Sequence, residues 1–312
     1  MSGLGYDTAM PDHAKELTTY HFRPAVQRDL PFEVIDYATL PERRRQLSLS
    51  EAPHRHSFFE IYYITRGSGT HFIDFEPYPI HPPVFFFISP GQVHCWELAE
   101  ALSGKVLLFT EDFMVLNPLS QNNVEDLPFF YTAVHHPLLE LDAEQQAAFE
   151  DSIREMEGEF TAELPGRGGV LRAQLYLLLV RLMRIYAAQN THRASGPDKA
   201  ATVRRFKHLI AGNLAVNQSV QAFAGELGIS ASRLGEITKE VTGLSPGKLL
   251  NREIALEAKR LLAHSDMSAA EIGYSLEFED PSYFGRFFKR ETGRSPRQFR
   301  EEIRKKYQFY PE

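Results

Sequence analysis

Three histidines and one glutamate in the first third of the chain have the residue types and the spacing of a ligand site. His54, His56 and Glu60 follow one another at even spacings, so their side chains share one face of a predicted strand. His94 can join them from a neighbouring strand. Imidazole nitrogens and a carboxylate can together bind Zn, Fe or Mn. Without a metal, the same groups can contact a polar ligand or stabilise turns.

Aromatic residues accompany this group. Phe58 and Tyr62 lie on the same predicted strand face, and Phe72 and Trp96 are further candidates. Their rings suit a small ring-bearing effector, although phenylalanine in a small barrel is also a frequent core residue. The candidate effector-binding residues are His54, His56, Phe58, Glu60, Tyr62, Phe72, His94 and Trp96.

The elements that position these residues are predicted to be short strands between turns. Segments rich in aromatic and β-branched residues end at turn-forming residues, and they span 58–65, 70–75, 84–88 and 105–109. Regularly spaced short strands suggest a barrel or a jelly roll.

Two segments, 54–67 and 90–94, resemble the two sequence motifs of cupins. Ser48 stands where the first motif opens with glycine, and Leu98 stands where the second closes with asparagine. The resemblance implies a cupin-like, effector-sensing domain over residues 1–140.

Two segments with helical periodicity follow, at 142–160 and 170–189. The second has a wide apolar face, and one side of it can pack on the barrel. Leu178, Leu182 and Ile185 are then candidates for a contact between two copies of the chain. A helix buried within one copy is the alternative. We predict a helical dimerisation segment at 141–190.

One pattern occurs twice in the last hundred residues, fifty positions apart. The first copy comprises Lys239, Thr242, Gly243, Ser245 and Pro246, and the second comprises Lys289, Thr292, Gly293, Ser295 and Pro296. An internal repeat indicates one supersecondary unit used twice. Each copy is predicted to hold two helices around a tight turn, with capping residues at Ser219, Ser230, Ser268 and Asp280. This is the pattern of a helix-turn-helix.

The two motifs form a predicted DNA-binding domain at 203–306. A polar segment rich in helix breakers, 191–202, precedes it and is predicted to be a linker. Between the copies, residues 246–263 lack an internal breaker after Gly247 and are predicted to form one linking helix.

Outward positions on the two second helices correspond one to one. The candidate DNA contacts are Ser230, Ser232, Arg233, Glu236 and Lys239 in the first copy, and Asp280, Ser282, Tyr283, Arg286, Lys289 and Arg290 in the second. Arg286, Lys289 and Arg290 can reach guanine edges or phosphates. Glu236 can accept a hydrogen bond from a cytosine amine but would repel phosphate. We expect the second copy to supply more of the electrostatic affinity.

This C-terminal region resembles the AraC/XylS family of transcription regulators. The resemblance rests on segments 224–230, 242–246 and 280–289, and covers about 203–303. Two departures stand in the second motif. Glu277 replaces the glycine of the turn, where a left-handed conformation would be strained, and Gly273 replaces an alanine at a cost of about 1 kcal/mol in helix propensity.

The resemblance implies an α+β protein of two domains. These are an N-terminal cupin-like β-barrel with a helical dimerisation segment, and a C-terminal all-α domain with two helix-turn-helix motifs joined by a linking helix. Such a protein regulates transcription by binding specific double-stranded DNA under the control of a small-molecule effector. A second copy and RNA polymerase are further expected partners. Since regulators of this kind mostly sense ligands without a metal, we expect no cofactor. The residues do not decide between activation and repression.

Charge and cysteine usage agree with this division. Residues 200–312 carry 18 Lys and Arg against 14 Asp and Glu, a net charge of +4, which leaves −11 for residues 1–199. A single Cys95 excludes a disulfide within one chain. No basic stretch followed by an apolar run opens the chain, so we expect a cytoplasmic protein without a membrane segment.

An enzyme is the alternative from another class: a metal-dependent cupin that uses His54, His56, Glu60 and His94, with the DNA-binding module as an accessory. The incomplete cupin motifs argue against it. Catalysis would also not need a duplicated DNA-reading unit, so we expect no enzymatic activity.

Overall fold

The computed structural model describes residues 19–22, 30–39, 53–115, 127–130, 137–162, 164–189 and 197–307. The chain divides into two compact units, whose described parts are residues 19–189 and 197–307. Ser48 and residues 191–196 of the predicted linker lie outside the described residues. Helix α5 begins at Pro197, so part of the segment predicted as linker is already helical.

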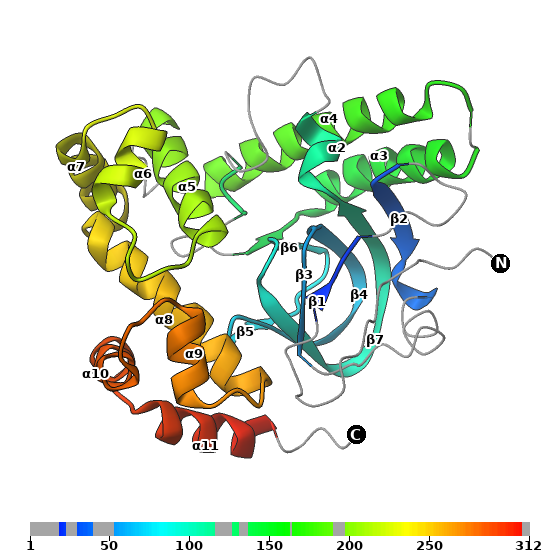
Figure 1. The fold of residues 1–312 in the computed structure, drawn as a ribbon. Coiled ribbons are helices and arrows are strands. Elements are labelled where there is room, and N and C mark those ends of the chain that lie inside the picture. The colour runs from blue at the N-terminus through cyan, green and yellow to red at the C-terminus, as the bar shows by residue number, and fades with distance from the viewer. Residues whose placement is uncertain are drawn as a thin grey trace. The chain divides into compact units, whose positions relative to one another are not determined.

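The first unit is built on an eight-stranded mixed sheet (Figure 1). Its strands are β1 (Thr19–Tyr20), β2 (Phe32–Asp36), β3 (His54–His56), β4 (Phe59–Ile73), β5 (Glu76–Pro79), β6 (Val84–Ile88), β7 (Val93–Phe109) and β8 (Leu138–Glu140). Hydrogen bonds connect them in the order β1-β3-β7-β4-β6-β8, with β2 on β7 and β5 on β4. Among the described strands, β1 and β3 alone pair in parallel.

The cupin-like, β-rich domain is confirmed, but the described strands form an open sheet where the sequence predicted a closed barrel. The two ends of the strand order are β1, of two residues, and β8, of three. Such short edge strands offer few backbone groups for pairing, so among the described residues the ring of hydrogen bonds is not completed.

Along the long strand β4, the side chains that point into the interior switch from even-numbered to odd-numbered residues. Its register against β7 shifts between Ile64 and Gly69. Gly67, with φ of 102°, permits this irregularity, because a Cβ there would lie 2.5 Å from the carbonyl oxygen of Ala101. A bulge reverses the alternation of side chains. The even-numbered Tyr62 and the odd-numbered His71 therefore face the same interior, with ring centroids 5.7 Å apart.

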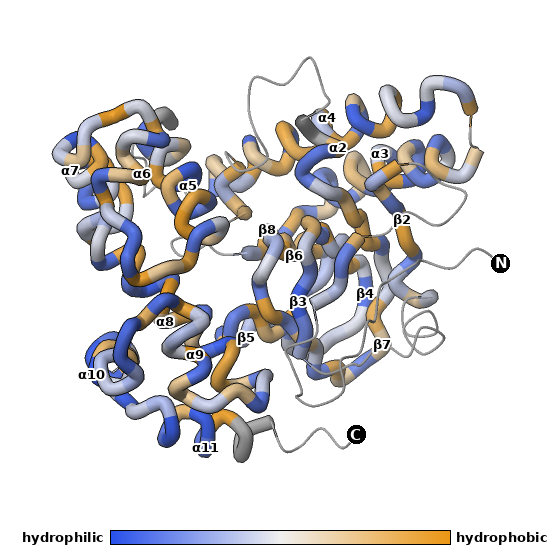
Figure 2. The backbone as a smooth tube through the Cα atoms, in the orientation of Figure 1, coloured by the Kyte–Doolittle hydropathy of each residue, from blue (hydrophilic) through white to orange (hydrophobic). Residues whose placement is uncertain are grey.

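The other face of the sheet packs against two helices, α3 (Ala143–Ala162) and α4 (Arg167–Gln189). Figure 2 shows hydrophobic stretches along α4, whose sequence includes the run LYLLLV at 175–180. Leu178 and Leu182 belong to the core that the helices share with the sheet, with 1% and 0% exposure. They were predicted as a contact between two copies, and this part of the prediction is wrong: the alternative, burial within one copy, holds for them.

The second unit consists of helices only, in its described part. They are α5 (Pro197–Gly212), α6 (Val220–Glu226), α7 (Ala231–Thr242), α8 (Pro246–His264), α9 (Ala269–Ser275), α10 (Pro281–Thr292) and α11 (Pro296–Tyr307). α6 with α7 and α9 with α10 are the two predicted helix-turn-helix motifs, and α8 is the predicted linking helix. α8 contacts α5, α7, α9, α10 and α11, so it forms the centre of this unit.

The predicted capping residues begin their helices as expected. The hydroxyl oxygens of Ser219, Ser230 and Ser268 each accept a hydrogen bond from a backbone N–H of the following first turn. Asp280 accepts from the N–H of Ser282, and Pro281 occupies the first turn of α10. Ser268 and Glu271 complete a capping box at α9.

Of the two departures from the family pattern, Gly273 lies in α9 and Glu277 lies in the turn that follows it. Glu277 has φ of 61°, which is the left-handed conformation expected from the family's glycine. Gly273 is buried against Phe284, and a Cβ at Gly273 would lie 3.1 Å from the Cβ of that residue. The missing methyl group therefore makes room for a phenylalanine of α10.

Candidate functional site

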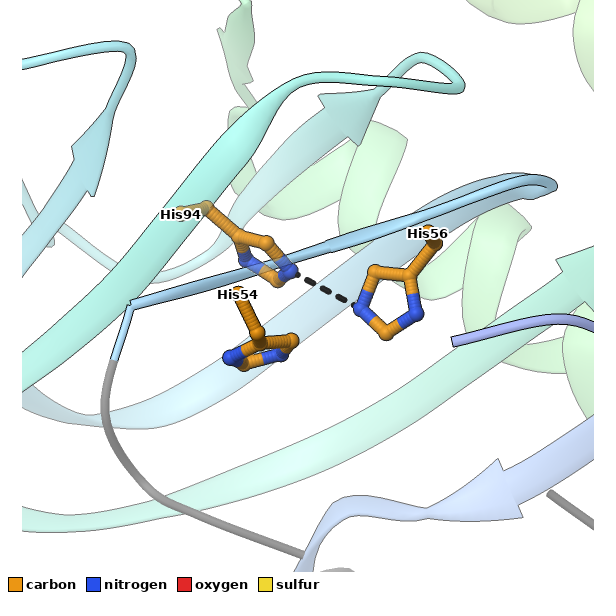
Figure 3. Close-up of side chains that lie close together, drawn as sticks. All are labelled: His54, His56 and His94. Atoms are coloured by element: carbon orange, nitrogen blue, oxygen red, sulfur yellow. Dashed lines mark hydrogen bonds between the residues drawn. The ribbon is translucent and has the colours of Figure 1, made fainter. Parts of the chain in front are cut away.

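The four residues with ligand-site spacing meet inside the first unit. β3 carries His54 and His56, β4 carries Glu60, and β7 carries His94, which pairs in register with His54. All four are buried, with exposures between 1% and 5%. One ring nitrogen from each histidine lies within 4.8 Å of those of the other two. Figure 3 shows the three imidazoles turned toward one another.

Short distances connect three of these groups. The Nε2 atoms of His56 and His94 are 3.1 Å apart. Oε2 of Glu60 lies 3.4 Å from Nε2 of His56 and 3.3 Å from Nε2 of His94. The same oxygen accepts a hydrogen bond of 2.8 Å from the hydroxyl of Tyr62. The structure thus brings these residues together, but Glu60 lies on β4 and not, as the spacing predicted, on the same strand as His54 and His56.

A fourth histidine, which the sequence prediction missed, belongs to the same cluster. His71 is fully buried, and its Nε2 lies 3.0 Å from Nδ1 of His94. Its ring stacks on Trp96 with centroids 3.4 Å apart and an interplanar angle of 12°. Counting by twos along β4 predicts an interior position for Phe72, its neighbour. Because of the bulges in β4, His71 faces the interior where Phe72 was predicted. Only the geometry of these bulges could have revealed His71.

The predicted aromatic residues divide accordingly. Phe58 is buried beside His56, with ring centroids 4.7 Å apart, and Tyr62 contacts Trp96 at 5.0 Å. Phe72 is only half-buried between the buried neighbours His71 and Ile73, so the structure does not place it with the cluster. The other three aromatic residues pack directly around the histidines and the glutamate.

Helices α7 and α10 carry the second group of candidate residues. Their first ten residues, 231–240 and 281–290, show the same order of buried, intermediate and exposed positions, residue by residue. Leu234 and Ile237 are buried where Phe284 and Phe287 are buried. The predicted contact residues are exposed on both helices: Ser232, Arg233, Glu236 and Lys239 on α7, and Ser282, Tyr283, Arg286, Lys289 and Arg290 on α10. Their capping residues Ser230 and Asp280 are exposed as well.

The exposed faces of the two helices differ in charge. On α7, Arg233 pairs with Glu236 at 2.9 Å, and Glu240 accepts from Lys199 of α5 at 2.6 Å. The exposed face of α7 therefore carries two carboxylates, Glu236 and Glu240, beside its two cations, Arg233 and Lys239. α10 exposes three cations in its corresponding positions and no carboxylate among them. Its positive surface can attract phosphate more strongly.

Aromatic rings hold two of the cations on α10. The guanidinium of Arg286 lies 5.9 Å from the ring centroid of Tyr283, and that of Arg290 lies 5.3 Å from the ring of Phe287. Arg290 also pairs with Glu291 at 2.9 Å, whereas the nearest carboxylate oxygen to Arg286, on Asp280, is 4.0 Å away. Arg286 is 69% exposed in its side chain and is the more available of the two for a partner.

A buried histidine and glutamate cluster in one unit and paired helix-turn-helix motifs in the other define a DNA-binding regulator with a ligand-binding domain. The sequence matches the family described as AraC-like ligand binding domain over residues 40–195 and a helix-turn-helix domain over residues 223–302. The chain belongs to the AraC family of transcriptional regulators.

Relatives of known function agree with this assignment. The HTH-type transcriptional activator RhaS of Escherichia fergusonii is 28% identical over 253 residues, which cover 80% of this chain and 87% of that protein. RhaS of Salmonella arizonae is 28% identical over 250 residues. Among solved structures, fatty-acid-bound ToxT of Vibrio cholerae is similar with 13% identity and a TM-score of 0.36, covering 78% of this chain and 87% of that chain.

None of the described helices combines the length with the apolar composition that a membrane-spanning segment requires.

Proposed function

We propose that this regulator reads two adjacent DNA segments, one with α7 and one with α10. The observation that carries the proposal is the identical order of buried and exposed residues on the two helices. Each helix buries one stripe against its own motif and exposes the polar positions that a recognition helix places in a major groove. Two such helices on one polypeptide allow a single copy to contact two successive grooves.

The two helices have unequal tasks in this proposal. Arg286, Lys289 and Arg290 supply contacts to phosphates and guanine edges, so α10 provides most of the electrostatic affinity. The Arg233–Glu236 pair leaves α7 with less attraction for phosphate. α7 therefore contributes mainly through hydrogen bonds to base edges, for which Glu236 selects cytosine.

In the first unit, we assign effector binding to the residues around the buried cluster: His54, His56, Phe58, Glu60, Tyr62, His94 and Trp96. His71 replaces Phe72 in this set. Binding there controls DNA binding if the effector has different affinities for two arrangements of the chain. The relatives named as activators support activation of transcription, with RNA polymerase as the protein partner. We assign no catalysis to the cluster. We further propose that the protein acts in the cytoplasm, because its proposed partner is DNA.

A homodimer completes the proposal. With Leu178 and Leu182 buried, the outer side of α4 is the candidate contact. Leu177 there is 53% exposed and Val170 is 42% exposed. They follow one another at helical spacing, so two copies of α4 can cover them symmetrically.

The test of DNA reading uses the full-length protein and a duplex enriched from a random pool at physiological salt. Footprinting should show two protected blocks about 10 base pairs apart, one helical turn of B-DNA. The double variant Arg286→Ala/Lys289→Ala should weaken binding strongly. Arg297→Ala on α11 is the control, because its side chain is 88% exposed and lies outside both predicted recognition helices. Equal affinity of the double variant and the wild type would contradict the proposal.

A further inference from the structure

We propose that the first unit binds one divalent transition-metal ion through His56, His94 and Glu60, with His54 as a further ligand. Three atoms that coordinate one ion at about 2.0–2.2 Å in adjacent positions lie roughly 2.9–3.5 Å from one another. The three measured separations among His56 Nε2, His94 Nε2 and Glu60 Oε2 are 3.1, 3.3 and 3.4 Å. The cluster therefore already has the spacing of three ligands around a common centre.

The donor set selects the class of ion. Neutral imidazole and carboxylate suit Zn, Fe or Mn, whereas Ca²⁺ and Mg²⁺ require mostly oxygen ligands. His54 extends the set, because one of its ring nitrogens lies within 4.8 Å of the nitrogens of His56 and His94. Its ring packs against His94 with centroids 4.5 Å apart and against Tyr20 at 5.2 Å. A small rotation in this packing would bring it to an ion held by the other three.

Because Glu60 is buried, a positive ion beside it would stabilise its carboxylate. Glu60 is 4% exposed, and the surrounding side chains Phe58, Tyr62 and Trp96 are at most 9% exposed. A buried carboxylate is stabilised by opposite charge as well as by hydrogen bonds. The hydroxyl of Tyr62 supplies one hydrogen bond. A divalent ion would supply the charge, and it would replace the proton that the two Nε2 atoms of His56 and His94 otherwise share.

His71 is a positioning residue in this arrangement. Its Nε2 lies 3.0 Å from Nδ1 of His94. If Nδ1 of His94 carries the proton, its N–H donates a hydrogen bond to Nε2 of His71. The lone pair on Nε2 of His94 then faces Glu60 and His56, as a metal ligand requires. Stacking on Trp96 holds the imidazole of His71 in place. Outer partners of this kind commonly change metal affinity by 10- to 100-fold.

The ligands come from three strands that are distant in sequence. β3 provides His54 and His56, β4 provides Glu60, and β7 provides His94. An ion would connect these strands and stabilise the interior of the domain. That this ion acts as the effector rests on the proposed function, since it requires that the first unit control DNA binding.

The test begins with full-length protein stripped by a chelator and then titrated with Co²⁺ or Zn²⁺ alone. We expect one ion per chain by elemental analysis, a visible absorption band with Co²⁺, and a change in fluorescence of Trp96, the chain's one tryptophan. His56→Gln and His94→Gln should weaken binding more than 100-fold, and His71→Gln by 10- to 100-fold. His81→Gln, at a 68% exposed side chain, is the control and should bind like the wild type. Far-UV circular dichroism of each variant verifies folding.

Absence of stoichiometric binding to the folded, stripped wild type would overturn the proposal. So would equal losses for His81→Gln and His94→Gln. DNA affinity is measured in parallel, with and without the ion. A protein that binds DNA specifically but takes no ion keeps the proposed function and loses the metal site. An ion that binds without changing DNA affinity by at least a few fold overturns its role as the effector.

Discussion

The side-chain amide of Asn217 donates a hydrogen bond of 3.3 Å to the backbone carbonyl of Glu277, sixty residues away. Next to it, the N–H of Val216 donates to the carbonyl of Leu276 at 3.2 Å. These hydrogen bonds connect the segment before the first helix-turn-helix to the turn of the second. The two motifs are therefore held together by this contact as well as by α8, and the contact stabilises Glu277 in its left-handed conformation.

Replacement of Glu277 by glycine should stabilise the second unit. The left-handed conformation costs a residue with a Cβ about 1–2 kcal/mol, and glycine removes this strain. Glycine also has more conformational freedom in the unfolded chain, which offsets part of the stabilisation. We expect Glu277→Gly to raise the free energy of unfolding by about 0.5–1 kcal/mol in urea titrations followed by far-UV circular dichroism. Glu277→Ala is the matched control, because it keeps the strain. A gain of the same size for alanine would contradict this explanation.

Lys207 makes the stability of the second unit depend on pH in the alkaline range. The pKa of its ammonium group is lowered to about 8, mainly because the group is buried; Glu253 opposes this shift and Arg252 contributes to it. Between this pKa and the ordinary value near 10.4, the unfolded chain holds more protons than the folded chain. Stability from this group should therefore rise as the pH increases from about 8 to 10.5.

Lys207→Met should remove this dependence and stabilise the unit at pH 7, by about 1–3 kcal/mol, because the buried charge is lost. Urea titrations at pH 7 and 10 give the comparison. Lys248→Met, on the exposed side of α8, is the control and should leave the pH dependence unchanged. Equal pH dependence in Lys207→Met and the wild type would show that Lys207 is not responsible.

Arg286→Ala should weaken binding to a selected duplex by about 1–3 kcal/mol. If the guanidinium reads guanine, base preference at one position should relax, and if it binds phosphate, all sequences should weaken equally. Fluorescence anisotropy on duplexes with single base changes, at two salt concentrations, distinguishes the two roles. Glu236→Gln on α7 should instead leave the salt dependence nearly constant or increase the affinity, since it removes a repulsive charge. An unchanged affinity for Arg286→Ala would exclude both of its roles.

Leu177→Glu should dissociate the proposed dimer without unfolding the chain. The side chain is 53% exposed on α4, so a charge there remains hydrated in the monomer. Sedimentation equilibrium reports the mass, and the fluorescence of Trp96 reports folding. Leu164→Glu, at a 58% exposed position before α4, is the control. Leu178→Asp should unfold the domain, because Leu178 is 1% exposed. A dimer that persists in Leu177→Glu would place the contact elsewhere.

Much of this protein could be predicted from its sequence because the signals are local. Caps, turns and helical periodicity determine the second unit, and its repeat specifies two motifs. Even spacing turns His54, His56 and Glu60 toward one interior, although Glu60 lies on β4 and the two histidines lie on β3. His71 could not be predicted, because the bulges around Gly67 reverse the side-chain alternation in β4. The burial of Leu178 and Leu182 depends on tertiary packing of the sheet against α4, which periodicity alone cannot assign.

The most direct test of the central claim is selection of duplexes from a random pool by the full-length protein, with the wild type and Arg286→Ala in parallel. Two unequal recognition helices predict an asymmetric site with two conserved blocks about 10 base pairs apart. If Arg286 reads a base, the variant should lose preference in one block only. A single enriched block for the wild type, or loss of both blocks with one substitution on α10, would contradict the account.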